Sequence, residues 1–137
     1  MDLNLNKLEK NINIKFKNKN LLRQSFIHKS FDRHNNNEKL EFLGDRVLGL
    51  VISKKLLEIY PDEKEGILDK KLASLVNKTK CSEVCEFLQL NKIIKTNNFS
   101  KKNNIIENKI ISDTCEALIG AIYLDQGIKV AEKIVLN

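Results

Sequence analysis

The sequence predicts an all-α domain, because apolar residues recur at helical spacing along nearly all of its 137 residues. Two apolar segments, residues 38–60 and 110–124, have the length of buried helices, and neither shows the alternation of a strand. A chain of this length suits one domain and can bury about two-thirds of its unfolded surface. We therefore expect a single helical domain over residues 1–137 with its own core.

The N-terminal region predicts two short helices. A weakly amphipathic helix begins around Leu3 and ends near residues 11–13. Residues 20–30 form a second helix, and its inner side carries Leu21, Leu22, Ser25 and Phe26.

The first long helix has recognisable ends. Asparagines at 35–37 supply an N-cap before Glu38, and acidic residues in the first turn suit the helix dipole. Pro61 stops this helix near Tyr60, because proline lacks a backbone N–H and restricts the preceding residue.

The C-terminal half continues the helical pattern. Helical spacing predicts one helix marked by Leu68, Leu72, Leu75 and Val76, and a short helix over residues 81–89. Residues 95–104 form a polar, basic loop before the second long helix. Residues 125–127 break that helix, and a final helix runs to the end of the chain.

The net charge of +6 is unevenly placed. Residues 1–34 carry +5 and residues 92–109 carry +4, whereas 35–91 and 110–137 carry −1 and −2. A basic periphery around an acidic centre suits a polyanion held near metal ions. A compositional bias toward lysine, asparagine and isoleucine is the alternative explanation.

Cysteine and histidine usage limits the class of protein. Cys81, Cys85 and Cys115 form neither a CxxC pair nor an even disulfide framework, which is typical of reduced thiols in a cytosolic protein. Two histidines argue against a zinc site. We see no membrane span or signal peptide, so we expect a cytoplasmic protein without a membrane partner.

Acidic residues gather on one side of each long helix. Glu38, Glu41 and Asp45 fall within about a 60° arc of an otherwise apolar helix. Asp113 and Glu116 share a face of the second helix. Ionised carboxylates in a mostly buried helix need a positive partner, and a hard divalent cation prefers oxygen ligands. A solvated acidic face is the alternative that spacing leaves open.

Glycines suggest how the two acidic faces meet. Gly49 projects onto the face of Glu38, and Gly120 onto the face of Asp113. Glycine inside a helix costs about 1 kcal/mol relative to alanine, so it usually has a packing reason. We infer that the helices approach closely and pool four carboxylates into a Mg²⁺ site: Glu41, Asp45, Asp113 and Glu116.

Residues 38–48, EKLEFLGDRVL, closely resemble the signature of bacterial ribonuclease III. Residues 113–121, DTCEALIGA, resemble the second acidic motif of that family. Phe16-Lys17-Asn18 and His28-Lys29-Ser30 are similar to its N-terminal helices, and Glu65-Gly66 to its middle helices. The resemblance covers nearly the whole chain, in the correct order.

The resemblance implies an all-α endonuclease domain that acts as a homodimer on double-stranded RNA. It makes Glu41, Asp45, Asp113 and Glu116 the metal ligands, with Asp45 and Glu116 also catalytic. Glu38 and Glu65 then line the catalytic valley across the dimer, and Phe42 packs into the partner subunit.

The implied chemistry uses Mg²⁺, with Mn²⁺ as a substitute. One ion lowers the pKa of a bound water, and a second, about 3.5–4 Å away, stabilises the leaving 3′ oxygen. The products carry 5′-phosphate and 3′-hydroxyl ends with short 3′ overhangs, and ribosomal RNA precursors are the usual substrates. Recognition rests on A-form shape, 2′-hydroxyls and phosphates.

Several points depart from the family pattern or stay open. Residues 89–104 lack the family's usual glycine-containing loop, and we expect a truncation before a C-terminal double-stranded-RNA-binding domain. Lys109 lies one turn before Asp113, where it contacts a phosphate, holds an acid, or is a plain surface lysine. A non-catalytic RNA-binding relative and an unrelated metal hydrolase are the rival functions.

Overall fold

The computed structural model describes residues 2–77, 81, 84–85, 88–97, 106 and 108–136. Its helices are α1 (Asp2–Ile12), α2 (Lys19–Ser25), α3 (Glu38–Ile59), α4 (Glu65–Leu75), the 3₁₀ turn η1 (Leu90–Lys92), α6 (Asn108–Gln126) and α7 (Ile128–Val135). An isolated β-bridge joins Ile27 and Lys95. The predicted all-α fold is confirmed.

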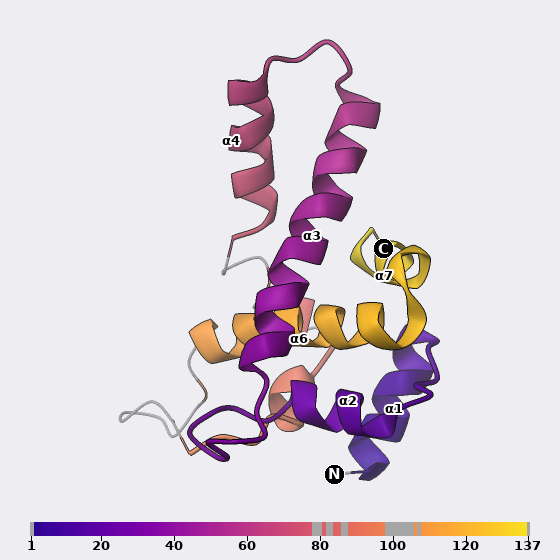
Figure 1. Cartoon of the computed structure of the whole chain (residues 1–137), viewed down its shortest axis with the longest axis vertical. Coiled ribbons are helices and arrows are strands. Elements are labelled where there is room, and N and C mark those ends of the chain that lie inside the picture. Colours follow the sequence, from indigo (N-terminus) through magenta and orange to yellow (C-terminus); the bar gives the residue numbers. More distant parts are fainter. Residues whose placement is uncertain are drawn as a thin grey trace.

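Helix α6 is the centre of the fold. Every residue of α6 from Ile110 to Ile122 is buried. Helices α2, α3 and α7 all pack on α6, which crosses the first half of α3 (Figure 1). The helix is buried all round because three neighbours cover it, which explains an apolar sequence with no solvent-facing stripe.

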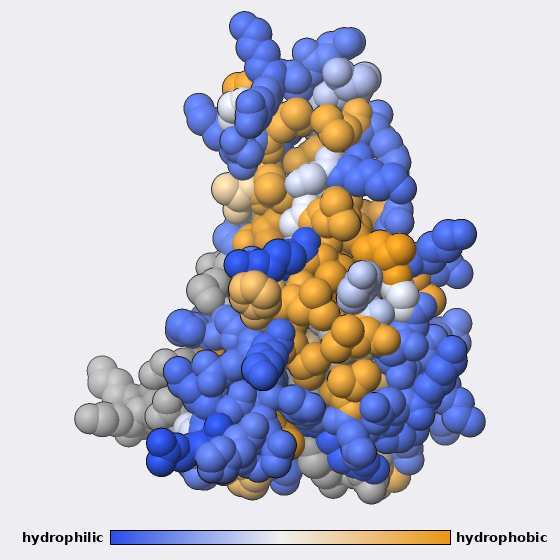
Figure 2. Space-filling view, in the orientation of Figure 1, coloured by the Kyte–Doolittle hydropathy of each residue, from blue (hydrophilic) through white to orange (hydrophobic). Residues whose placement is uncertain are grey.

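Helices α3 and α4 form a hairpin that extends beyond α6 (Figure 1). No residue of α4 is buried. Large apolar side chains are exposed along both helices, among them Leu50, Leu57 and Ile59 of α3 and Ile67 and Leu75 of α4. Figure 2 shows apolar atoms gathered over this hairpin and continuing toward α6 and α7. The hairpin therefore presents an apolar surface that the chain itself does not cover.

Most predicted helix ends are confirmed. Helix α3 ends at Ile59, two residues before Pro61, and α6 ends before Gly127, which has a φ of 92°. At the start of α3, the side-chain oxygen of Asn36 accepts the N–H of Glu38 at 3.1 Å. Of the predicted helix over 81–89, the structure describes residues 81, 84 and 85 as helical and 88–89 as a turn. The predicted loop over 95–104 lies largely outside the described residues.

The prediction of one helix over residues 20–30 was wrong beyond Ser25. The Lys95 N–H donates to the Phe26 carbonyl at 2.7 Å, and the His28 N–H donates to the Lys95 carbonyl at 2.9 Å. A contact with a strand-like segment far along the chain thus replaces the local helical bonds. Leu22, Ser25 and Phe26 are nevertheless buried, as predicted.

The N-terminal region is tied to the end of α6 by Asp125. Its carboxylate accepts the backbone N–H of Lys17 at 2.8 Å and that of Asn18 at 2.9 Å. Burial acts to raise the pKa of Asp125, but these hydrogen bonds outweigh it and leave the pKa below its ordinary value. Among the described residues, no helix has the length and apolar character that crossing a bilayer requires.

Candidate active site

Helices α3 and α6 touch through their main chains at two glycines. A Cβ atom on Gly44 would lie 1.6 Å from the carbonyl oxygen of Glu116, and one on Gly120 would lie 2.2 Å from that of Leu40. Only glycine allows this approach. The expectation for Gly120 is confirmed, but that for Gly49 was wrong, because a Cβ there meets nothing within 4 Å.

The crossing brings three of the predicted acids together. Carboxylate oxygens of Glu41, Asp113 and Glu116 all lie within 4.8 Å of one another. Asp113 and Glu116 are buried and Glu41 is half-buried. Glu41 precedes Gly44 by one turn, and Glu116 is the residue whose carbonyl faces that glycine. The close helix contact therefore sets the spacing of the three carboxylates, which we call the acidic trio.

Asp45 lies outside the trio, although it lines the same pocket. Its Oδ2 is 3.4 Å from Nη1 of Arg46, and its side chain is half exposed. The Arg46 guanidinium in turn lies 3.8 Å from the centre of the Phe42 ring. The pocket has a volume of about 390 Å³ and is lined by Glu38, Glu41, Phe42, Asp45, Arg46, Val76 and Glu116.

Lys109 holds an acid, which was one of the alternatives for this residue. Its Nζ donates to Oδ2 of Asp113 at 2.8 Å. This hydrogen bond and the charge of Asp113 raise the pKa of Lys109. The trio therefore already has a cation at one edge.

Glu65 is not near the trio of its own chain. It is exposed and is the first residue of α4, whereas Val76, just after the other end of α4, lines the acidic pocket. An eleven-residue helix is about 16 Å long. A role for Glu65 across a dimer stays a prediction.

A network around His28 was missed from the sequence. The Ser30 N–H donates to Nδ1 of His28 at 3.1 Å, and the Ser30 and Thr96 hydroxyls hydrogen-bond at 2.9 Å. Burial, followed by the charge of Lys29, lowers the pKa of His28, although Asp113 opposes this shift. Ser30 and Thr96 are 66 positions apart, so no local spacing could have indicated the contact.

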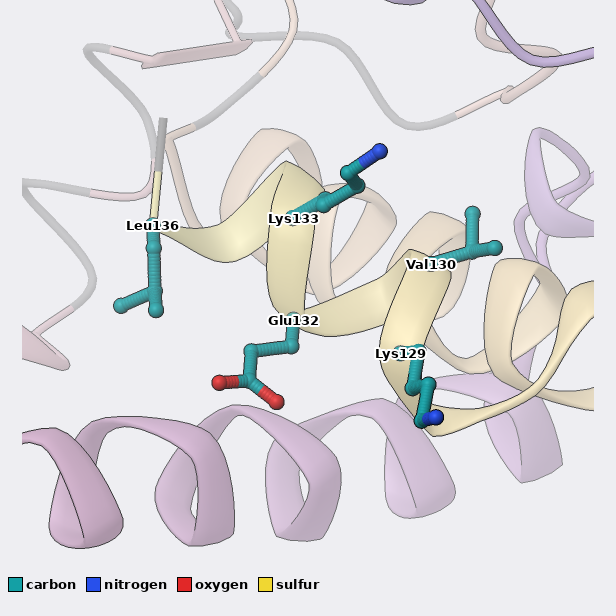
Figure 3. Close-up of a pocket in the computed structure, with 5 residues that line it drawn as sticks. All are labelled: Lys129, Val130, Glu132, Lys133 and Leu136. Carbon is teal, nitrogen blue, oxygen red and sulfur yellow. The ribbon is translucent and has the colours of Figure 1, made fainter.

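A second pocket, about 580 Å³ in volume, lies along α7. Figure 3 shows Glu132 extending from α7 toward α3, while Lys133 points away from α3. Glu132 is 3.8 Å from Lys54 of α3. This pocket contains one carboxylate, already near a lysine, so it lacks the convergent acids of the first pocket.

The family model described as ribonuclease-III-like matches residues 18–137. The chain belongs to this ribonuclease-III-like family. It is 58% identical to ribonuclease 3 of Pelagibacter ubique (strain HTCC1062) over all 137 residues, which cover 62% of that protein. It is 41% identical to ribonuclease 3 of Campylobacter fetus subsp. fetus (strain 82-40), over 97% of this chain and 60% of the other. The chain thus spans about three-fifths of the length of these relatives.

Solved ribonuclease III structures share the fold. The nuclease domain from Campylobacter jejuni, described for structural flexibility in a region involved in dimer formation, matches with a TM-score of 0.88 and 41% identity. That match covers 95% of this chain and 92% of the other. Dicer from Pichia stipitis matches with a TM-score of 0.66 and 27% identity, over 88% of this chain and 51% of the other.

Proposed function

We propose that this ribonuclease-III-like domain is a divalent-cation-dependent endoribonuclease that cleaves double-stranded RNA. One observation carries the proposal: in a chain of this family, two helices bring the carboxylates of Glu41, Asp113 and Glu116 within 4.8 Å of one another. Three oxygen donors at this separation fit a hard cation such as Mg²⁺, with Mn²⁺ as a substitute.

The acids of the pocket have distinct proposed roles. Glu41, Asp113 and Glu116 would hold the cation, and Asp45, which lines the same pocket beside Arg46, would be the fourth ligand. When bound, divalent cations would lower the pKa of a bound water and stabilise the negative charge on the leaving 3′ oxygen of an in-line displacement. The products would carry 5′-phosphate and 3′-hydroxyl ends with short 3′ overhangs.

We propose a homodimer formed through the α3–α4 hairpin. The hairpin exposes large apolar side chains on both helices, and Phe42, at the acidic pocket, is 60% exposed. Contact with a partner subunit would bury these apolar side chains, which this chain leaves exposed. Glu38 at the pocket and Glu65 at the tip of the hairpin would then line one valley from two subunits.

The proposed substrate is an RNA duplex, with ribosomal RNA precursors as the natural case. Exposed cations Lys29 and Arg33 precede α3, and exposed Lys95 pairs with the same loop, so positive charge lies near the acidic pocket. Phosphates of an A-form duplex suit such a surface. A cytosolic location fits the three cysteines, which are free and buried.

The test is a cleavage assay on a long RNA duplex with Mg²⁺. Glu116→Gln should slow cleavage by about 100-fold or more, since even groups that only orient metal ligands typically contribute 10–100-fold. Glu132→Gln removes one carboxylate from the α7 pocket and should cut like the unaltered protein. Full cleavage in excess EDTA, or by Glu116→Gln, would overturn the proposal, as would equal cleavage of single strands.

A further inference from the structure

Lys109 reaches from solvent to an almost fully buried acid. Its side chain is 68% exposed, whereas that of Asp113 is 9% exposed. The two are joined by the 2.8 Å bond from Nζ to Oδ2. The Lys109 side chain can therefore move into solvent without disturbing the core, whereas the Asp113 side chain stays buried.

Lys109 also interacts electrostatically with the other two acids of the trio. The charges of Glu41 and Glu116 add to that of Asp113 in favouring the ammonium form. The ammonium donates to one oxygen of Asp113, while carboxylate oxygens of Glu41 and Glu116 lie within 4.8 Å of that group. A divalent cation placed among these oxygens would repel the ammonium already there.

From the proposed metal-dependent function, we infer that Lys109 is a resident counter-ion that a divalent cation displaces from Asp113. The ammonium neutralises part of the trio while no metal is bound. Lys109 and the metal compete for Asp113, so each weakens the binding of the other, as linkage requires.

A different role for Lys109 makes the opposite prediction. If Lys109 stayed in place and oriented Asp113 as a ligand, removing it would weaken metal binding. If Lys109 is displaced, removing it strengthens metal binding. The sign of the change in metal affinity therefore separates the two roles.

Lys54 offers a control. It also carries one positive charge and pairs with an acid, but its 3.8 Å contact is with Glu132 of the α7 pocket. Lys54→Gln therefore removes the same charge without freeing an oxygen of a proposed metal ligand. Lys109→Arg keeps the charge and serves as the conservative variant.

The experiment titrates Mn²⁺ into metal-free protein and follows the free ion by electron paramagnetic resonance. Lys109→Gln should tighten Mn²⁺ binding by about tenfold, within the usual range of coupling between two ligands. Lys54→Gln should change it by less than about threefold, because exposed charge pairs couple weakly. Lys109→Arg should stay near the unaltered protein.

Thermal melting gives an independent readout and shows that each variant folds. Lys109→Gln should melt below the unaltered protein without metal, and this difference should vanish in saturating Mg²⁺. Weaker Mn²⁺ binding by Lys109→Gln, or an equal gain in Lys54→Gln, would overturn the displacement. An unaltered protein that binds no Mn²⁺ would instead overturn the proposed metal-dependent function, and the displacement with it.

Discussion

The two halves of α3 have similar apolar content but different surroundings. The first half, which contains Gly44, lies against α6 with main-chain contact, and its acids point into one pocket. The second half pairs with α4, where no residue is buried, and exposes Leu50, Leu57 and Ile59. Apolar content alone therefore does not determine burial in this helix.

The difference lies in what each half meets. Gly44 faces a second glycine on α6, so this side of the first half is packed within the chain. The second half meets α4, of which no residue is buried, and contacts α7 through Lys54 and Glu132. The first half therefore lines the acidic pocket, while the second half carries the exposed apolar residues on which the proposed dimer depends.

The largest expected effect is at the glycine crossing. Gly44→Ala forces a Cβ into the Glu116 carbonyl and should lower the free energy of unfolding by about 3 kcal/mol or more. Gly49→Ala, in the same helix with open space around it, should raise it by up to about 1 kcal/mol. Urea denaturation measures both, and similar values for the two variants would contradict the crossing.

The next effect concerns the exposed half. Leu57→Lys places a charge on the hairpin and should raise the dimer dissociation constant about thirtyfold, the effect of roughly 2 kcal/mol. The fold should be unchanged, because Leu57 is 57% exposed. Leu3→Lys on α1, where the leucine is 71% exposed, is the control. Sedimentation equilibrium decides, and a dimer that tolerates Leu57→Lys would show that the hairpin is not the interface.

The smallest effect concerns the contact between the N-terminal region and Asp125 at the end of α6. Asp125→Asn weakens the two bonds from Lys17 and Asn18 and should cost about 1–2 kcal/mol. Because folding lowers the pKa of Asp125, its contribution is fully present above the ordinary value of 3.8 and is lost as pH falls through the folded value.

The difference between Asp125→Asn and the unaltered protein should therefore be constant above about pH 5 and shrink in stronger acid. Asp62→Asn, in the exposed turn between α3 and α4, is the matched control. Chemical denaturation at a series of pH values measures the effect. A difference that grows on acidification would contradict the assignment.

Local patterns predicted most of the helices and all three acids of the trio. Glu41, Asp113 and Glu116 could be placed on helix faces from spacing alone, and Pro61 marked a helix end. The crossing point could not be placed, because Gly44 and Gly49 are both glycines in one helix and only the partner distinguishes them. Gly44 lies between Glu41 and Asp45, and that position was the signal available in the sequence.

Contacts between distant segments were beyond local patterns. The end of α2 depends on Lys95, which pairs with Ile27 across more than sixty positions. The pairing of Asp45 with Arg46 rather than with the trio depends on side-chain torsions that helix spacing does not determine. Arg46 directly follows Asp45 in the signature, residues 38–48. This adjacency was a signal for the pairing that helix spacing did not use.

The main-chain contact between α3 and α6 makes the spacing of the acids independent of many core substitutions. The separation of Glu41 and Glu116 is fixed by backbone atoms around Gly44 and Gly120, not by the size of core side chains. Substitutions in the remaining core, such as Ile122 or Leu22, can then alter stability while leaving the spacing of the acids intact. The interior of this domain can therefore be repacked without moving the acids, provided that Gly44 and Gly120 remain.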